Sequence, residues 1–511
     1  MASAMSSPFY ITTPIYYPNA APHIGSTYTT TYADTVARYH RALGEETFFL
    51  TGTDEHGQKI AETAAKEGVE PKAFVDRISE RFRSTWQELG LTPDRFIRTT
   101  EAAHKHAVRH FWQLLHDQGQ IHFQDYSGRY CVGCERFLTE RELVDGKCAQ
   151  HQVEPVLRTE ANYFFNMAPH MPWLIAELES NPDLISPARY RNEVLAMLRS
   201  GELEELCISR PRERLEWGIP LPFDEQYVLY VWLDALINYL TGIGYPDDPD
   251  WERRWAGVHH LIAKDILKPH AIFWPVMLHA AGIPLYQGLH VHGYWSMDNQ
   301  KISKSLGNLV DPLIMKQKYG FEAFRYYLLR EMSFGLDGEF SEEALVRRIN
   351  ADLANDLGNL ANRSLSMLER YFEGVVPESS GASELSQAAE SAARQLDQQL
   401  RGFNTQRALI ALWELIGAVN KYIDTQAPWK LAKSPASRDQ LGSVLYECME
   451  ALRVIAVLLE PFLPETSARI LGCLGDPAPG ATLHEKLRWG GLAPGTQTRK
   501  GEPLFPRIET S

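Results

Sequence analysis

The sequence predicts an α/β architecture with one parallel sheet, followed by a bundle of α-helices. The first fifty residues alternate strand and helix signals, and buried-strand signals return much later, at 258–263 and 288–292. From about Glu342 the strand signals largely stop, and apolar residues recur at helical spacing. We therefore expect a long insertion to divide one sheet, and the helical part to come after it.

The opening segment has the pattern of a strand, a helix and a second strand. Residues 9–13 (FYITT) and 46–51 (ETFFLT) have strand composition, and residues 28–41 have helical periodicity. In parallel sheets, ligands bind beyond the carboxyl ends of the strands. Residues that directly follow these strands are therefore the first candidates for a site.

Two series of apolar residues at helical spacing define the helical part. They are Leu409, Leu412, Trp413, Ile416, Val419 and Ile423, and then Leu441, Leu445, Met449, Leu452, Ile455 and Leu459, closed by Pro461. Residues 377–386 form a Ser/Gly-rich connector, and the tail after about Pro477 is rich in Pro and Gly. We find no repeat of fixed period.

Composition restricts the class of protein. A chain of 511 residues, 44% hydrophobic and 23% charged, exceeds one core and is expected to form several packed units. It has neither a membrane-length apolar run nor the features of a signal peptide at its N-terminus, so we expect a cytoplasmic protein. The net charge of −14 argues against indiscriminate nucleic-acid binding. It does not exclude a basic patch that binds one RNA by its shape and a few contacts.

Three of the six cysteines, Cys131, Cys134 and Cys148, fall within eighteen residues, and His151 follows. Two close pairs of ligands across a short loop suit tetrahedral Zn²⁺, with glycines at 133 and 146 in tight turns. The alternative is a chance cluster of free thiols. Four protein ligands leave no open position, so the zinc is expected to be structural.

Two polar segments suit phosphate. In the first, Gly25 allows close approach of the backbone at the start of the helix, and His23 can donate a hydrogen bond. In the second, Lys301 and Lys304 place two ammonium groups in the loop 301–308 (KISKSLGN). Taken alone, a His beside a glycine turn more often has a structural role than a ligand. A loop with two lysines, taken alone, is more often a solvated basic loop.

Asp54 follows the second strand, in the run 51–57 (TGTDEHG). Its carboxylate could bind a substrate ammonium group through a charge-assisted hydrogen bond. The alternative is an ordinary helix N-cap.

The two phosphate segments, in this order and roughly 280 residues apart, resemble the HIGH and KMSKS signatures of class I aminoacyl-tRNA synthetases. Ser26 replaces the second His of the first signature. Ile302 replaces the Met of the second, which is a near-isosteric apolar change. Leucyl, isoleucyl and valyl enzymes of this class are usually much longer, with a large editing domain that does not fit here.

Several further runs resemble the methionyl-tRNA synthetase family in particular, over about residues 8–475. They are 10–19 (YITTPIYYPN), 48–57 (FFLTGTDEHG), 230–236 (YVWLDAL), 264–275 (KDILKPHAIFWP), 356–363 (DLGNLANR) and the single zinc knuckle, with His151 in place of a fourth cysteine. The resemblance implies an enzyme that activates methionine with ATP and Mg²⁺ to methionyl-adenylate and pyrophosphate. It then transfers methionine to the 3′ end of tRNA(Met).

The resemblance also implies roles for individual residues, at the following positions. The methionine pocket comprises Ile15, Tyr17, Asp54, Trp232, Ala235, Leu236, Tyr239, Ile266 and His270. The ATP site comprises His23, Gly25, Ser26, Lys264, Asp265, His292, Gly293, Lys301 and Lys304. Within it, His23, Ser26, Lys301 and Lys304 are the catalytic residues. The anticodon readers are Asn359, Arg363 and Trp429, and the zinc ligands are Cys131, Cys134, Cys148 and His151.

The implied domains are a Rossmann-type catalytic domain in two halves (1–120 and 226–295), interrupted by a zinc-binding connective insertion (121–225). After them come the KMSKS-type loop with its stem-contact region (296–345), the anticodon-binding helical bundle (346–475) and a tail (476–511). Because the sequence has no additional β-barrel RNA-binding domain, we expect a monomer.

Other interpretations remain open at this stage. Trp232, Leu236 and Tyr239 could simply be a buried helix face. Asn359 and Arg363 could be a solvated polar pair, and Trp429 a core residue. One alternative function is that of a small-metabolite nucleotidyltransferase. Another is that of a catalytically weakened synthetase paralogue that only binds RNA, which the replacement of the signature His by Ser26 suggests.

Overall fold

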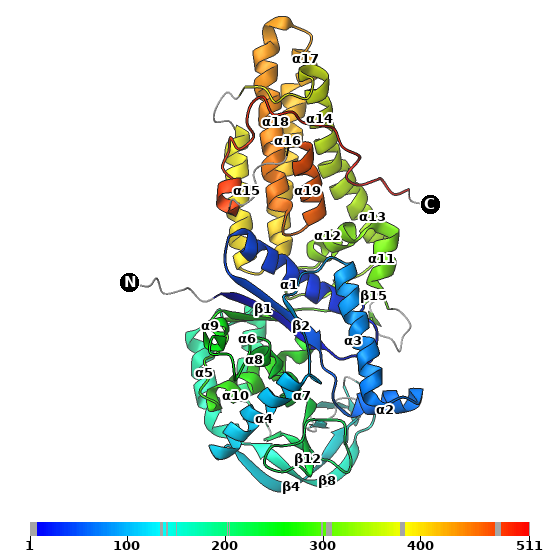
Figure 1. The fold of residues 1–511 in the computed structure, drawn as a ribbon, viewed down its shortest axis with the longest axis vertical. Coiled ribbons are helices and arrows are strands. Elements are labelled where there is room, and N and C mark those ends of the chain that lie inside the picture. The colour runs from blue at the N-terminus through cyan, green and yellow to red at the C-terminus, as the bar shows by residue number, and fades with distance from the viewer. Residues whose placement is uncertain are drawn as a thin grey trace. The chain divides into compact units, whose positions relative to one another are not determined.

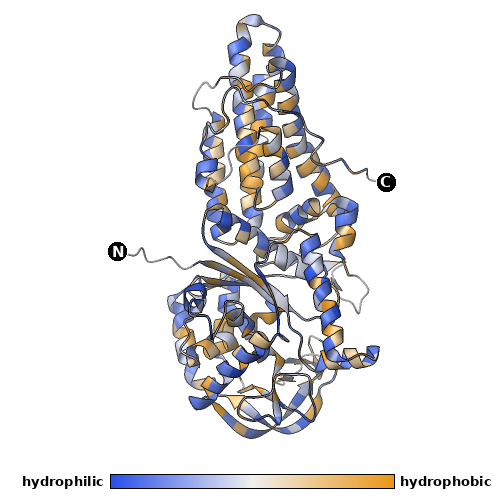
Figure 2. Cartoon of the chain, viewed as in Figure 1, coloured by the Kyte–Doolittle hydropathy of each residue, from blue (hydrophilic) through white to orange (hydrophobic). Residues whose placement is uncertain are grey.

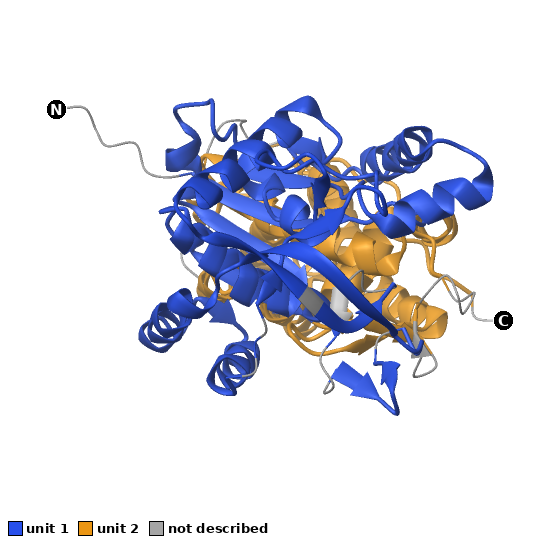
Figure 3. Cartoon of the chain, turned by 90° about the horizontal axis from the view of Figure 1, so that it is seen from below, with its two compact units in different colours: residues 1–22, 48–292 blue, residues 23–47, 293–511 orange. Residues whose placement is uncertain are grey.

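The computed structural model describes residues 8–132, 136–138, 142–149, 151–201, 203, 205–297, 300–302, 309–378, 384–475 and 482–509; the side chains of residues 126, 136, 137, 300 and 301 are outside this description. The chain forms two compact units (Figure 3). Unit 1 comprises Met1–Pro22 and Phe48–His292, and unit 2 comprises His23–Thr47 and Gly293–Ser511.

Unit 1 is built on a six-stranded sheet with the order β3-β2-β1-β13-β14-β9. These strands are β1 (Phe9–Tyr16), β2 (Thr47–Thr53), β3 (Arg95–Arg98), β9 (Ile185–Ser186), β13 (Val258–Ala263) and β14 (Gly288–His292). The pairs β1–β13, β13–β14, β14–β9 and β2–β3 are parallel, with Tyr10 opposite Val258 and His259 opposite Gly288. The predicted parallel sheet with a long insertion is confirmed.

Most helices of unit 1 pack their apolar sides into its main core, and the first two pack against each other in a smaller cluster. The helices are α2 (Gln58–Glu67), α3 (Pro71–Glu88), α4 (Ala102–Asp117), α5 (Met171–Ser180), α6 (Ala188–Arg199), α7 (Val231–Ala235), α8 (Asn238–Thr241), α9 (Trp251–Trp255) and α10 (Trp274–Ala280). The main core of the unit includes Phe111, Trp112 and Trp274, all without solvent exposure. Figure 2 shows the hydrophobic residues concentrated in the sheet strands and along the helix faces. Burial of these aromatic side chains stabilises the layer of helices against the sheet.

The insertion forms a smaller, mainly antiparallel sheet with the order β10-β8-β4-β5. Its strands are β4 (Ile121–Cys131), β5 (Arg136–Leu138), β8 (Val156–Phe165) and β10 (Leu206–Cys207), and shorter strands are β6 (Leu143–Val144), β7 (Lys147–Cys148), β11 (Ser209–Pro211) and β12 (Tyr227–Leu229). In the middle of the insertion the chain returns to the main sheet, as β9. The segment 121–225 thus contributes to both sheets.

Unit 2 contains the helical bundle together with α1 (Ile24–Ala42). Its other helices are α11 (Pro312–Tyr319), α12 (Phe321–Glu331), α13 (Glu342–Arg348), the π-helix η6 (Ile349–Gly358), α14 (Asn359–Phe372), α15 (Glu384–Arg401), α16 (Thr405–Gln426), α17 (Pro428–Leu431), α18 (Arg438–Leu459), α19 (Pro464–Cys473) and α20 (Leu483–Lys486). The strands β15 (Trp295–Met297), β16 (Gln300–Lys301) and β17 (Gly338–Glu339) form a small sheet. Figure 1 shows α14, α15, α16 and α18 running alongside one another.

The two predicted apolar series coincide with α16 and α18, and the predicted helical bundle is confirmed. The division of the chain into six segments remains a prediction. The two compact units have other boundaries, since residues 23–47 group with the bundle. In the described part of the chain, the helices are all too short or too polar to cross a lipid bilayer.

Candidate active site and metal centre

Predicted site residues follow or end four neighbouring strands of the main sheet. Tyr17 follows β1, Asp54 follows β2, Lys264 and Asp265 follow β13, and His292 ends β14. Parallel strands present their carboxyl ends at one edge, so these residues gather there even though they are far apart in the sequence. Lys264 and Asp265 begin a 3₁₀ turn, η3 (Lys264–Ile266).

The loop after β2 is fixed by a dense set of hydrogen bonds. The Asp54 amide donates to the Tyr16 carbonyl at 3.0 Å, and Asp54 is 8% exposed. The next residue, Glu55, is fully buried and accepts two hydrogen bonds from Arg98, at 2.6 and 3.0 Å. Helix α2 begins only at Gln58, with Gly57 as its N-cap, so Asp54 is not an N-cap. Its carboxylate is held at the sheet edge in a rigid loop.

The predicted pocket residues divide into a buried and a partly exposed group. Those buried are Ala235, Leu236, Tyr239 and His270, and those partly exposed and packed against the same core are Ile15, Tyr17, Trp232 and Ile266. Trp232 lies on α7 and Tyr239 on α8, two short helices rather than one continuous face. This arrangement offers a partly open apolar and aromatic wall with a rigid backing, as an unbranched apolar ligand requires.

His270 is held as a neutral imidazole. It lies on the π-helix η4 (Pro269–Phe273), and its Nδ1–H donates to the Ile266 carbonyl at 2.9 Å. Its Nε2 then accepts the Tyr239 hydroxyl proton, at 2.7 Å. Burial lowers the pKa of His270 to about 4, although the hydrogen bond to the Ile266 carbonyl opposes this. The imidazole therefore presents an uncharged surface at neutral pH.

A buried carboxylate between two histidines lies behind this wall. Asp234 on α7, 1% exposed, contacts His56 Nδ1 at 2.6 Å and His104 Nε2 at 2.7 Å. Burial alone would raise the pKa of Asp234, but the His56 charge and the hydrogen bonds from both imidazoles outweigh it and hold this pKa at about 2. The network ties α7 to the loop that carries Asp54 and to α4. These three residues were not predicted from the sequence, in which the one signal is an Asp within the apolar run 230–236.

In unit 2, the N-terminus of α1 carries the first phosphate segment. His23 is the N-cap, and its Nδ1 accepts the Gly25 amide proton at 3.1 Å, which leaves the proton of a neutral imidazole on Nε2. The Ser26 hydroxyl accepts the His23 amide proton at 3.1 Å and donates to the His23 carbonyl at 3.0 Å. The first turn has no acidic residue, so the helix terminus favours an anion.

At two positions of the predicted ATP site, a side chain would come too close to neighbouring atoms, so glycine is favoured there. A Cβ at Gly25 would lie 2.9 Å from Cε1 of His23, so the imidazole can fold over the helix start only because residue 25 is glycine. A Cβ at Gly293 would lie 2.1 Å from the Leu336 carbonyl oxygen. The loop after β14 is thereby fixed by backbone packing within unit 2.

The second phosphate segment is largely outside the described residues. Lys304 falls outside them entirely, and for Lys301 only the backbone is described, as the end of β16. Ile302, which replaces the Met of the signature, is 7% exposed. An apolar residue is thus buried at this position, as the near-isosteric exchange suggested.

Three of the predicted metal ligands converge. One ligand atom each of Cys131, Cys148 and His151 lies within 4.8 Å of the others. His151 Nδ1 is 3.7 Å from Sγ of Cys148 and 4.0 Å from Sγ of Cys131. Cys134 lies outside the described residues. Gly146, with φ +75°, supplies the tight turn between β6 and β7 that brings Cys148 into place. Separations of this size suit ligands at about 2.0 to 2.3 Å around one tetrahedral ion.

The three predicted anticodon readers lie on the helical bundle. Asn359 is exposed on α14, and Arg363, one turn on, donates to Asp424 of α16 at 2.7 Å. Trp429 follows Pro428 at the start of α17, near one end of the bundle (Figure 1), and is 39% exposed. This exposure excludes the alternative that Trp429 is a core residue, and an exposed aromatic ring is available for stacking.

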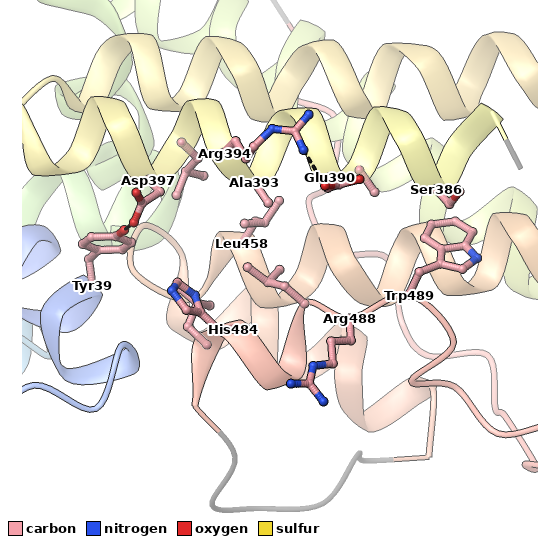
Figure 4. Close-up of a pocket in the computed structure, with 14 residues that line it drawn as sticks. Tyr39, Ser386, Glu390, Ala393, Arg394, Asp397, Leu458, His484, Arg488 and Trp489 are labelled. Carbon is pink, nitrogen blue, oxygen red and sulfur yellow. Dashed lines mark hydrogen bonds and ion pairs between the residues drawn. The ribbon is translucent and has the colours of Figure 1, made fainter. Parts of the chain in front are cut away.

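A separate cavity of about 600 Å³ lies in unit 2, among α15, α18 and the region of α20 (Figure 4). Its apolar lining includes Leu396, Leu458 and Leu483. The Glu390–Arg394 ion pair of α15 also lines it. None of the predicted site residues lines this cavity.

Two family models match the chain. A model described as tRNA synthetases class I (M) matches residues 9–154 and 141–365, and one described as the anticodon binding domain of methionyl tRNA ligase matches residues 376–511. Together they cover most of the sequence, in the order of the sheet unit and the helical bundle.

Similar proteins agree with these models. The methionine–tRNA ligase of Caldanaerobacter subterraneus subsp. tengcongensis is 45% identical over 99% of this chain and 80% of its own length. That of Deinococcus radiodurans is 46% identical over 98% of this chain and 74% of its own length. Among solved structures, Mycobacterium tuberculosis methionyl-tRNA synthetase in complex with methionyl-adenylate has a TM-score of 0.93 at 40% identity, covering 98% of this chain and 100% of that one.

Proposed function

The chain belongs to the methionyl-tRNA synthetase family of class I aminoacyl-tRNA synthetases, and from this premise we propose which of its residues carry out the reaction. It activates methionine with ATP, forming methionyl-adenylate and pyrophosphate, and transfers the methionyl group to tRNA. The methionine carboxylate attacks the α-phosphorus, pyrophosphate leaves, and a terminal ribose hydroxyl of the tRNA then attacks the acyl carbon. No covalent enzyme intermediate is needed, so positioning and charge stabilisation supply most of the catalysis.

Methionine binds at the carboxyl edge of the main sheet. Asp54 accepts the α-ammonium group, and the side chain lies against the apolar and aromatic wall. Its members are Ile15, Tyr17, Trp232, Ala235, Leu236, Tyr239, Ile266 and His270. A thioether suits such a wall because dispersion and sulfur–aromatic contacts need no polar partner. The neutral state of His270 supports this role, since a charged imidazole would penalise an uncharged ligand.

ATP binds with its phosphates at the N-terminus of α1. His23 donates from Nε2, Gly25 allows close approach, and Lys301 and Lys304 neutralise charge on the departing pyrophosphate, together with Mg²⁺. Ser26 acts chiefly by holding His23, because its hydroxyl is engaged with the His23 backbone in both directions. The remaining ATP contacts, near the ribose and the adenine, are Lys264, Asp265, His292 and Gly293.

The tRNA anticodon is read by the bundle. Trp429 stacks on a loop base, while Asn359 and Arg363 hydrogen-bond to exposed base edges. The partial exposure of Trp429 supports this, as does the position of Asn359 and Arg363 one turn apart on α14. The bases would compete with Asp424 for the Arg363 guanidinium.

One zinc ion is held by Cys131, Cys134, Cys148 and His151. Bound there, Zn²⁺ supplies a structural crosslink and no catalysis, because four protein ligands fill its tetrahedral shell. The support is the convergence of two buried thiols and one imidazole at the base of the β6–β7 hairpin.

The observation that carries the assignment of the methionine and ATP residues is that Asp54, Lys264 and His292 follow or end the strands β2, β13 and β14 of one parallel sheet. The test is ATP–pyrophosphate exchange across the amino acids, with the variants Asp54→Asn and Asp94→Asn. Asp94 is the matched control, because its carboxylate bonds to the Phe49 amide in the first half of β2, away from the carboxyl edge.

Exchange should require methionine, and Asp54→Asn should raise the KM for methionine by roughly 10- to 100-fold, as loss of a charge-assisted hydrogen bond predicts. Asp94→Asn should leave this KM unchanged. Exchange with a different amino acid would contradict the specificity. No exchange with any amino acid, alongside retained tRNA binding, would favour the RNA-binding paralogue. An equal rise in KM for both variants would refute the role given to Asp54.

A further inference from the structure

The helix that carries His23 and Ser26 is packed into the helical bundle. Although α1 follows the first strand of the main sheet in sequence, residues 23–47 belong to unit 2. The orientation of its N-terminus therefore depends on the contacts that α1 makes with bundle helices.

One of these contacts is a buried guanidinium that donates four hydrogen bonds. Arg325 on α12 is 2% exposed and donates to Asp34 Oδ2 at 2.6 Å and to Thr35 Oγ1 at 2.8 Å, both on α1. It also donates to the carbonyls of Pro461 at 2.9 Å and Phe462 at 2.7 Å. A single side chain thus joins the middle of α1 to the turn between α18 and α19.

Two tyrosines reinforce the same attachment. The Tyr32 hydroxyl donates to the Phe403 carbonyl between α15 and α16, and the Tyr39 hydroxyl donates to Asp397 on α15. Figure 4 shows Tyr39 and Asp397 facing each other at one end of the cavity. Tyr32, Thr35 and Tyr39 recur at helical spacing, so one face of α1 meets the bundle.

We propose that Arg325 is a positioning residue for methionine activation: by tying the middle of α1 to the α18–α19 turn, it fixes where His23 and Ser26 stand. This inference rests on the proposed function. It adds a residue that contacts neither substrate and lies about 300 positions from His23 in sequence.

The geometry sets the size of the effect. Asp34 is eleven residues from His23, or about 16 Å along the helix. A tilt of about 4° at Asp34 would therefore move His23 by about 1 Å, and displacements of that size cost on the order of 100-fold in rate. A planar guanidinium with four acceptors in fixed directions resists such a tilt, whereas a lysine ammonium has neither the planar fork nor enough donors.

The chain offers a matched control in the same unit. Arg453 on α18 is also 2% exposed, pairs with the buried Glu450 at 2.6 and 2.9 Å, and donates to the carbonyls of Lys486 and Arg488. Its hydrogen bonds tie the C-terminal segment to α18, and among the described residues none of them goes to α1. Both arginines join a carboxylate to two carbonyls, so their loss should affect folding similarly.

The experiment compares Arg325→Lys and Asp34→Asn with Arg453→Lys and Glu450→Gln. Asp34→Asn is the second variant at the proposed site, because Arg38 remains beside residue 34 and the side chain keeps its size. Each protein is assayed for single-turnover formation of methionyl-adenylate at saturating ATP and methionine, well below its melting temperature. Methionine affinity in the absence of ATP and the melting temperature are measured alongside.

Arg325→Lys and Asp34→Asn should slow adenylate formation by roughly 10- to 100-fold, with methionine affinity within about twofold of the parent. Arg453→Lys and Glu450→Gln should lose comparable thermal stability and stay within about twofold of the parental rate. If the Arg325 variant is no slower than the Arg453 variant at the same loss of stability, the inference is overturned and Arg325 only holds the fold. A parent that forms no methionyl-adenylate would overturn the proposed function itself, and the inference with it.

Discussion

Replacing Asp234 by Asn should loosen the proposed methionine pocket without changing any residue that we propose to bind methionine. The carboxylate is 1% exposed and accepts from an imidazole on each oxygen, at 2.6 and 2.7 Å. An amide keeps the shape but can accept on one oxygen only, so one of these contacts, to His56 or His104, is lost. A hydrogen bond to a charged group contributes about 1.5 to 3 kcal/mol, so the free energy of unfolding should fall by that amount.

For a unit of about 270 residues, that loss corresponds to a drop in melting temperature of roughly 3 to 5 °C. Because Asp234 ties α7 to the loop of Asp54, methionine affinity should weaken by about tenfold, equivalent to about 1.4 kcal/mol. Calorimetry and methionine titration followed by tryptophan fluorescence measure the two effects. The control is Asp247→Asn, since Asp247 pairs with His106 at 3.5 Å on the surface, where both side chains are more than half exposed. Exposed pairs contribute at most about 1 kcal/mol.

The pH dependence provides a sharper check on the same pair of proteins. The folded pKa of Asp234, about 2, lies below the value near 3.9 of an unfolded aspartate. The carboxylate therefore stabilises the fold above about pH 4, and this contribution is lost as the pH falls toward 2. The gap in melting temperature between the parent and Asp234→Asn should stay constant from about pH 7 to 5 and shrink below about pH 4. The reasoning would be refuted if this difference in melting temperature disappeared between pH 7 and 5, or if the two proteins had the same melting temperature at pH 7.

Three further outcomes follow from the proposed sites. Metal analysis after purification without chelator should give one zinc per chain, and Cys148→Ala should lower it; less than about half an equivalent in the parent would count against the site. Trp429→Ala and Arg363→Ala should spare pyrophosphate exchange but slow tRNA charging, with about 1 to 3 kcal/mol lost with the Trp429 ring; equal losses in both assays would mean a structural role. His23→Ala should slow adenylate formation by on the order of 10² to 10³, and Ser26→Ala by less, with methionine affinity unchanged; a parental rate in Ser26→Ala would remove any role for the hydroxyl.

Features fixed by neighbouring residues were predictable from the sequence. The bounds of β13 and β14 are those expected, because each is a short run of apolar and His residues followed by a charged residue or by glycine. Gly146 was expected at a tight turn and has φ +75°. The short strand β9 was not predicted, because two residues within an insertion carry no periodicity. The grouping of α1 with the bundle also has no local signal, since it depends on contacts with residues as distant as Arg325 and Phe403.

Residues assigned to bind a ligand can be predicted from neighbouring residues in the sequence. Residues that hold those ligand-binding residues in place cannot. Asp54 and His23 stand in recognisable runs, because a ligand needs several groups close together at a strand end or a helix start. Asp234 and Arg325 act through partners 130 to 291 positions away in sequence. A buried charge of this kind is stable only when all its donors or acceptors are satisfied, so it fixes the elements that supply them. Asp234 provides such a network in unit 1, and Arg325 provides one in unit 2. We therefore expect substitutions at Asp234 to change methionine affinity and substitutions at Arg325 to change the rate of activation, because each network supports a different substrate's contacts.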